Sequence, residues 1–227
     1  EERKVASSTK IYDRTGKTVL YDVHQNIRRT VIPGSEMGVN IKNATIAIED
    51  SEFYQHHGVK PTAVLRAVVM NFLAPFTGGN YQGGSTITQQ VIKNALLTST
   101  RSVTRKIKEW VLAFKLEQIM SKDDILTLYL NEAPYGGNMY GVAEATRSFF
   151  GKEPRDLSLA EAAYLAALPQ APSHYSPYGN NRSGLDNRAR LVLKRMRELG
   201  FISEDDYQKA LVERVEFIPG AVSGGRA

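Results

Sequence analysis

Three side chains around Glu49 have the types and spacing that acid–base chemistry needs. On a helix, Glu49, Phe53 and His56 stand at positions i, i+4 and i+7, so they share one face. An aromatic ring beside a carboxylate lowers the local dielectric, which helps a glutamate to act as acid or base near neutral pH. A helix end with a solvated acid pair, Glu49 and Asp50, and a buried Phe53 explains the same pattern. The spacing alone leaves both interpretations open.

A glycine-rich loop precedes a second group of polar side chains. Gly83 and Gly84 stand before a predicted helix start, where glycine lets a ligand approach the backbone and free N–H groups attract anions. The polar residues that follow include two pairs at i, i+4 spacing, and they are Ser85, Thr86, Gln89, Gln90, Lys93 and Asn94. Such a group suits a phosphate or sugar hydroxyls, whereas the plainer interpretation is a capped helix after a flexible loop.

A third group follows in the string TRKIKEW. Arg105 and Glu109 stand at i, i+4, and Lys106 precedes Glu109 by three residues. An intrahelical ion pair contributes only about 0.2–0.5 kcal/mol, and the order Arg before Glu is the less favourable one. The functional alternative is a second carboxylate beside two cations, which would hold a pyrophosphate leaving group and offset its growing charge.

Composition bounds the class of protein. The chain has 227 residues, 42% hydrophobic and 23% charged, which indicates a folded protein of one large domain or two small lobes. The net charge of +5 suits phosphate-bearing partners but selects none. Cysteine is absent, which excludes disulfides and thiolate sites, and the histidines form no HExxH-type pair, so no dedicated metal site is expected.

The ends of the sequence also carry an expectation. No apolar run reaches the roughly 18 residues that span a bilayer, and no secretory signal is present. The abrupt charged start leads us to expect a segment of a longer protein.

Hydrophobic periodicity predicts a mainly α chain with a small β entry. Two apolar-rich runs around residues 13–16 predict a β-hairpin within residues 9–32, and residues 28–32 are expected to add a further strand before Pro33. Helices are predicted from residue 43 to a stop at Gly58, and over residues 61–76, 85–97, 104–120 and 186–199. Three further helices are predicted to begin at capping boxes, formed by Ser121 with Asp124, Ser158 with Glu161 and Ser203 with Asp206.

Together these strings resemble a known family. EDSEFYQHHG, GGSTITQQVIKN, RKIKE, ILTLYLNEAPYGGNMYGVAEATRSFFGK and LSLAEAAYLAALPQAPSHYSP occur in this order. They resemble the five signature blocks of the peptidoglycan glycosyltransferase (transglycosylase) domain of class A penicillin-binding proteins and monofunctional transglycosylases. The resemblance covers about residues 9–220, nearly the whole chain.

The resemblance implies roles for individual residues. Glu49 matches the catalytic base, which would deprotonate the acceptor sugar 4-hydroxyl of lipid II, and Glu109 matches a second, supporting glutamate. Lys93, Arg105 and Lys106 match cationic positions that contact the diphosphate. The other matched substrate-binding positions are Asp50, Phe53, His56, Gly84, Ser85, Thr86, Gln89, Gln90, Asn94, Asn131 and Tyr135. Glu132 and Glu144 match no catalytic position, and we expect them to be structural or solvated.

The implied fold is mainly α and lysozyme-like, with a larger head lobe, a smaller membrane-facing jaw lobe and a short N-terminal β hairpin. Residues 1–40 are expected to pack toward a neighbouring domain, 41–212 to form the glycosyltransferase domain with its jaw at about 60–83, and 213–227 to lead toward a transpeptidase domain. Phe72, Leu73 and Phe76 are candidates for insertion into the membrane surface, and an ordinary core helix is the alternative.

The resemblance also implies a setting. The expected function is polymerisation of lipid II at the outer face of the cytoplasmic membrane, with inversion and release of undecaprenyl diphosphate, and moenomycin is expected to bind the same cleft. Partners are lipid II, the growing lipid-linked glycan and the membrane surface, and no nucleic acid is expected. No cofactor is required, and a divalent cation, Mg or Mn, at the diphosphate is left open. A lysozyme-like glycan hydrolase and an inactive cell-wall scaffold are the alternatives.

Overall fold

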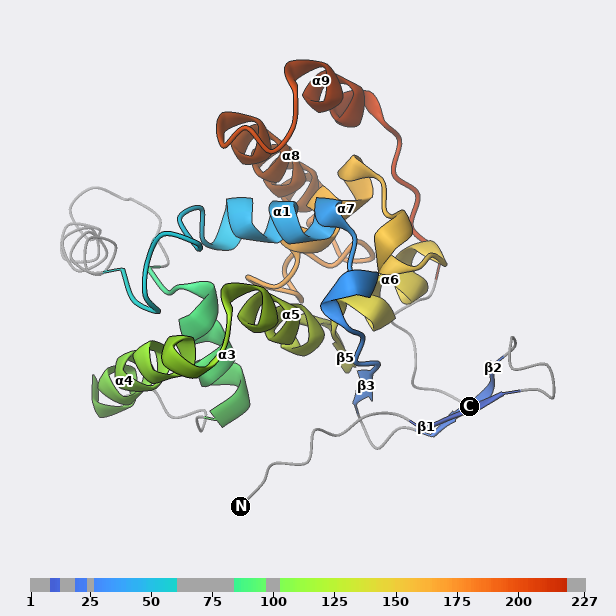
Figure 1. Cartoon of the computed structure of the whole chain (residues 1–227). Coiled ribbons are helices and arrows are strands. Elements are labelled where there is room, and N and C mark those ends of the chain that lie inside the picture. The colour runs from blue at the N-terminus through green and yellow to red at the C-terminus, as the bar shows by residue number, and fades with distance from the viewer. Residues whose placement is uncertain (1–8, 13–18, 24–26, 61–83, 97–102, 220–227) are drawn as a thin grey trace. The chain divides into compact units, whose positions relative to one another are not determined.

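The computed structural model describes residues 9–12, 19–23, 27–60, 84–96 and 103–219 (Figure 1). This part of the chain is mainly helical with short strands, which confirms the predicted mainly α class. The chain divides into two compact units: unit 1 comprises residues 1–48 and 130–227, and unit 2 comprises residues 49–129. Among the described residues, no helix combines the length and the apolar character that crossing a membrane demands.

The described residues of unit 1 form two small sheets. Strand β1 (Thr9–Tyr12) pairs antiparallel with β2 (Val19–Val23), which confirms the predicted hairpin. The second sheet has the order β3-β5-β4, in which β3 (Arg28–Arg29) runs parallel to β5 (Met139–Tyr140) and β4 (Pro134–Gly136) runs antiparallel to it. The predicted strand near residues 28–32 is therefore present but only two residues long.

Helices are the main regular elements in the described part of unit 1. They are α1 (Val39–Glu49, whose last residue belongs to unit 2), α6 (Val142–Phe150), α7 (Leu159–Ala167), α8 (Arg182–Glu198) and α9 (Glu204–Val212), with short 3-10 turns at Gly34–Glu36 and Pro154–Asp156. Helix α7 packs against α8, and α8 against α9 (Figure 1). The buried stripe of α8 is Leu185, Ala189, Val192 and Met196, at the i, i+4, i+7, i+11 spacing of a core-facing helix.

In the part of unit 2 that the structure describes, three helices follow the loop after α1. They are α3 (Ile87–Leu96), α4 (Val103–Ile119) and α5 (Lys122–Glu132), the last of which ends in unit 1. Helices α3 and α4 pack together. Apolar side chains that are almost fully buried fill this unit, among them Phe53, Ile87, Ile92, Ala113 and Ile125. The predictions for residues 85–97 and 104–120 are confirmed within two residues at each end.

The three predicted capping sites begin helices as expected. At α7, the Ser158 hydroxyl accepts from the Glu161 N–H and the Glu161 carboxylate accepts from the Ser158 N–H, which completes the box. At α5 and α9 only half of the box forms, because the serine hydroxyl accepts from the backbone and itself donates to the nearby aspartate. An aspartate side chain is one methylene shorter than glutamate, so it reaches back less readily.

The predicted end of the first helix is wrong, and the helices predicted from residues 43 and 186 each begin four residues earlier. Helix α1 ends at Glu49, and residues 51–55 form turns in place of the predicted helical continuation to Gly58. Glu49, Phe53 and His56 therefore do not share a helical face. The physical reason lies at Asp50, whose carboxylate is engaged by three other groups and holds the chain in a loop.

Some predictions fall outside the described residues. The jaw at about 60–83, with Phe72, Leu73 and Phe76, lies there except for Lys60. The helix predicted over 61–76 and the hairpin turn at 13–16 lie there as well.

Candidate functional site

Glu49 is held by the helix that follows the glycine-rich loop. The side-chain amide of Gln90, on α3, donates to one carboxylate oxygen of Glu49 at 2.8 Å. Glu49 is half-buried at the end of α1. The two residues are distant in sequence, so the packing of unit 2 brings together members of two separate predicted groups.

Asp50 is an anchor for the site. Its carboxylate is almost fully buried, and it accepts the backbone N–H of Ile87 at 3.0 Å, contacts His56 at 2.9 Å and pairs with Lys60 at 2.7 Å. Burial alone would raise the pKa of Asp50, but the hydrogen bonds and charges of His56 and Lys60 outweigh burial, so the pKa lies below its usual value. Asp50 thus stays ionised and holds the first residue of α3.

The start of α3 is capped by its own polar residues. The Thr86 hydroxyl oxygen accepts the Gln89 N–H at 3.1 Å, and the Gln89 side-chain oxygen accepts the Thr86 N–H at 2.8 Å. Thr86, Gln89 and the Asp50 carboxylate thereby occupy three backbone N–H groups at this helix start. The expectation that free N–H groups here attract an anion is wrong for these three groups, because protein oxygens already satisfy them.

Glu109 and Lys106 form a charged pair beside the same helix start. Glu109 on α4 is 1% exposed, and the Lys106 ammonium contacts one of its carboxylate oxygens. The same ammonium donates to the Ser85 hydroxyl at 2.8 Å. The structure therefore brings Ser85, Lys106 and Glu109 together, and Lys106 remains partly open to solvent.

The remaining predicted residues of unit 2 differ in exposure. Lys93 is exposed on α3, whereas Gly84, Asn94 and Arg105 are half-buried. Phe53 is fully buried, with its ring edge toward His56, and the centroids of the two rings are 6.2 Å apart. Phe53 is therefore a packing residue for the loop that contains Asp50 and His56, and its substrate contact stays a prediction.

Asn131 and Tyr135 belong to unit 1, where both are buried. The Asn131 amide accepts the Ile32 N–H at 3.1 Å and donates to the Ile32 carbonyl at 2.9 Å, so it fixes the chain after β3. Glu132 pairs with buried Arg29 at 3.0 Å, and Glu144 accepts from the Thr30 hydroxyl. Both acids have the structural role that we expect of them, and ligand binding by Asn131 and Tyr135 stays a prediction.

Sequence reasoning missed two residues of this region. Lys60 pairs with Asp50, and Gly58 was assigned only to a helix stop. Gly58 has φ +80°, its carbonyl accepts the Thr86 hydroxyl at 2.6 Å, and a Cβ placed on it would lie 2.7 Å from the Ala113 carbonyl oxygen. The glycine thus joins the start of α3 to the middle of α4. The string HHGVK, with Gly58 and Lys60 two residues apart, was the available signal, but a glycine indicates a helix end equally well.

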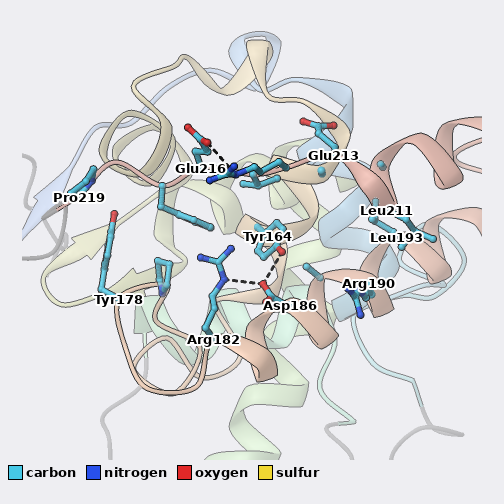
Figure 2. Close-up of a pocket in the computed structure, with 17 residues that line it drawn as sticks. Tyr164, Tyr178, Arg182, Asp186, Arg190, Leu193, Leu211, Glu213, Glu216 and Pro219 are labelled. Atoms are coloured by element: carbon cyan, nitrogen blue, oxygen red, sulfur yellow. Dashed lines mark hydrogen bonds and ion pairs between the residues drawn. The ribbon is translucent and has the colours of Figure 1, made fainter.

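A separate hollow of about 840 Å³ lies in unit 1 (Figure 2). Tyr164, Arg182 and Asp186 form a hydrogen-bonded group on its floor, and the segment 213–219 borders it. Phe217 of this segment packs edge-on against Tyr164, with the Arg182 guanidinium 4.9 Å from its ring centroid. None of the predicted site residues lines this hollow.

In the part of the chain that the structure describes, no group of three or more His, Cys, Asp or Glu side chains is arranged to hold a metal ion. The acids beside α3 already have partners: Asp50 contacts His56 and pairs with Lys60, and Glu109 pairs with Lys106. A divalent cation at the diphosphate stays an open prediction.

Comparison with known proteins gives a consistent picture. A family model described as Transglycosylase matches residues 16–197. Penicillin-binding protein 1A of Clostridium perfringens (strain 13 / Type A) is 44% identical over 209 residues, which cover 86% of this chain and 31% of that protein. Penicillin-binding protein 1A of Aquifex aeolicus (strain VF5) is 42% identical over 204 residues, which cover 90% of this chain and 27% of that protein. The chain thus spans less than a third of the length of these relatives.

A solved structure shares the fold. The crystal structure of penicillin-binding protein 1A from Haemophilus influenzae matches 95% of this chain and 22% of its own chain, with a TM-score of 0.54 and 23% identity. At this identity the match shows the fold alone.

Proposed function

The chain belongs to the transglycosylase family of peptidoglycan glycosyltransferases, and we propose that it polymerises lipid II into β-1,4-linked glycan strands. The proposal assigns Glu49 as general base, Glu109 as its supporting carboxylate, and the cations beside α3 to the diphosphate. The observation that carries it is the contact of Lys106 with both Ser85 and the buried Glu109, which sets a cation at the start of the helix that holds Glu49.

The proposed step at the acceptor is a proton transfer coupled to attack. Glu49 takes the proton of the acceptor 4-hydroxyl, and that oxygen forms a bond to the anomeric carbon of the growing chain. The bond from this carbon to the diphosphate oxygen breaks, and undecaprenyl diphosphate leaves with the electron pair. Attack from the face opposite the leaving group inverts the α-linked donor to a β-1,4 linkage. The hydrogen bond from Gln90 supports this role, because it orients the Glu49 carboxylate.

The proposed step at the donor is stabilisation of the growing negative charge. Lys106 is partly open to solvent, and its second partner is a neutral hydroxyl, so it retains donor capacity for a phosphate oxygen. Lys93 is exposed on α3 and supplies a further cation. A diphosphate leaving group needs such cations, whereas hydrolysis of a neutral glycan does not. The presence of these cations therefore favours glycosyl transfer over the hydrolase alternative.

The proposed setting follows from the relatives. Penicillin-binding proteins act in cell-wall synthesis, so we place this domain at the outer face of the cytoplasmic membrane, on lipid-linked substrate. The relatives are more than three times longer than the matched segment, and we propose that a transpeptidase domain accompanies it in the same polypeptide.

The test is incubation of the purified chain with lipid II in detergent, followed by gel separation of the products. A ladder of glycan polymer that moenomycin suppresses is the expected result. Release of short sugars from preformed glycan without polymer would instead identify a hydrolase, and neither product would identify a scaffold.

A further inference from the structure

Two contacts anchor the first turn of α3 at adjacent positions. The Ile87 N–H donates to Asp50 at 3.0 Å, and the Thr88 hydroxyl donates to Glu117 of α4. A backbone N–H lies nearly parallel to the axis of an α-helix, whereas a side chain projects from its side. Anchors at two such positions resist both displacement of α3 and its rotation about its own axis.

The second anchor is a buried carboxylate with a cation of its own. The Glu117 side chain is 5% exposed, and the oxygen that accepts from Thr88 also pairs with the Lys122 ammonium at 2.8 Å. Lys122 is the first residue of α5, and its ammonium lies 4.6 Å from the centroid of the Phe53 ring. A carboxylate buried to this degree is stable only with such partners, so its position is closely defined.

The two anchors are connected to each other. Phe53 lies under Lys122 and packs edge-on against His56, and His56 contacts Asp50 at 2.9 Å. The contacts therefore form a closed ring that runs from Thr88 through Glu117, Lys122, Phe53, His56 and Asp50 back to Ile87. Such a ring holds the start of α3 on two sides. It thereby also fixes the directions in which the next residues of the helix project.

Gln90 lies two residues beyond Thr88 on the same helix, and its amide holds Glu49 at 2.8 Å. We propose that Glu117 is a positioning residue: it fixes the rotation of α3 and, through it, the hydrogen bond from Gln90 to Glu49. The catalytic consequence of this inference rests on the proposed function, whereas the structural consequence does not. In the part of the chain that the structure describes, Glu117 bonds to Thr88 and Lys122, and neither residue is predicted to bind substrate.

The structural consequence can be measured without substrate. The side-chain amide resonance of Gln90 is assigned in ¹⁵N-labelled chain by its loss in Gln90→Ala. We expect Glu117→Ala to move this resonance, and Glu117→Gln, which keeps an acceptor oxygen, to leave it near its original place. Tyr54→Phe is the matched control, because it removes a hydrogen bond to Asp123 that also joins the 50–60 loop to α5. An unmoved Gln90 resonance in Glu117→Ala, or an equal shift in Tyr54→Phe, overturns the proposal.

The catalytic consequence is measured as kcat and KM for lipid II polymerisation by the same variants. We expect Glu117→Ala to lower kcat roughly tenfold with little change in KM, since misplaced catalytic groups cost rate more than binding. In a Gln90→Ala background the same change should lower kcat by less than about twofold, because both substitutions remove one interaction. Full additivity of the two losses, or a loss in KM alone, overturns the proposal.

Two further measurements separate a loss of positioning from a loss of folding. Thermal unfolding of each variant establishes the folded fraction, and Thr88→Val, which removes only the hydroxyl, replaces Glu117→Ala if that variant does not fold. We expect Thr88→Val to move the Gln90 resonance in the same direction, and an unmoved resonance again overturns the proposal. If the unaltered chain makes no polymer, the proposed function fails, while the resonance still decides whether Glu117 positions Gln90.

Discussion

The side-chain amide of Gln90 donates to the carboxylate of Glu49 at 2.8 Å, so the orientation of Glu49 depends on a helix 41 residues further along the chain. The start of that helix is fixed in turn by Asp50, the neighbour of Glu49. Glu49, the proposed base, and Asp50, which anchors the helix of Gln90, are thus adjacent in sequence. A small shift of this loop would therefore move both residues.

Glu49→Gln should abolish polymerisation of lipid II and leave the fold nearly intact. The glutamine is isosteric and its oxygen can still accept from Gln90, but it cannot take a proton from the acceptor hydroxyl. Product gels measure the activity, and thermal unfolding measures the fold. Glu52→Gln, the same chemical change on an exposed side chain of the same loop, is the control and should retain activity. Polymer formed by Glu49→Gln at the unaltered rate would show that Glu49 is not the base.

Lys93→Ala and Arg105→Ala should each weaken binding of a diphosphate-bearing donor. Each removes a charge-assisted contact of roughly 1.5–3 kcal/mol, and Lys93 is exposed, so its loss should leave stability unchanged. Titration calorimetry with a donor analogue measures the affinity. Lys108→Ala, an exposed lysine on α4, serves as the control for general loss of positive charge. Equal affinities for all three variants would count against the diphosphate assignment.

Stability should fall in acid because of Asp50. Its pKa in the folded protein lies below the ordinary value of 3.8, so its stabilising contribution is complete above that value and is lost as the pH falls through the lowered pKa. Urea unfolding from about pH 6 to pH 2.5 measures this slope, and Asp50→Asn should reduce it. Asp205→Asn, at an exposed position of α9, should keep the slope. An unchanged acid slope in Asp50→Asn would contradict the prediction.

Gly58→Ala should destabilise the chain by more than a positive φ alone explains. The new Cβ would lie 2.7 Å from the Ala113 carbonyl oxygen, whereas at Gly200, with φ +71°, no atom lies within 4 Å. Both substitutions share the strain of the left-handed backbone, and Gly58→Ala adds a clash of about 1–3 kcal/mol. Comparison of the two variants by urea unfolding isolates that clash. Equal losses of unfolding free energy in the two variants would mean that α4 moves away from the new Cβ at no cost in free energy.

Local patterns in the sequence predicted most of the helices. Apolar periodicity fixes α4 and the core face of α8, and the serine caps locate the starts of α5, α7 and α9 because capping is a contact between residues three apart. The end of α1 escaped prediction. It depends on His56, Lys60 and the Ile87 N–H around Asp50, and the last of these is 37 residues away.

The candidate site, like the fold, was predictable from the sequence only in part. Residue types and spacing marked Glu49, Glu109 and Lys106 as candidates, because the chemistry of these side chains is visible in the sequence. The pairing of Glu49 with Gln90 and of Lys106 with Ser85 depends on how α3 and α4 pack, which spacing within one helix does not encode. Glu117 and Lys122 look like ordinary surface charges of a helix end, and only their burial beside Thr88 and Phe53 distinguishes them.

The buried pair of Arg29 and Glu132 has a practical consequence for fragment design. Arg29 is 4% exposed and Glu132 is 6% exposed, and their atoms meet at 3.0 Å. A shortened polypeptide that starts beyond residue 29 would leave a carboxylate inside the protein with its cation removed, at a cost of about 3–5 kcal/mol. Material intended for crystallisation or inhibitor screening should therefore begin upstream of Arg28.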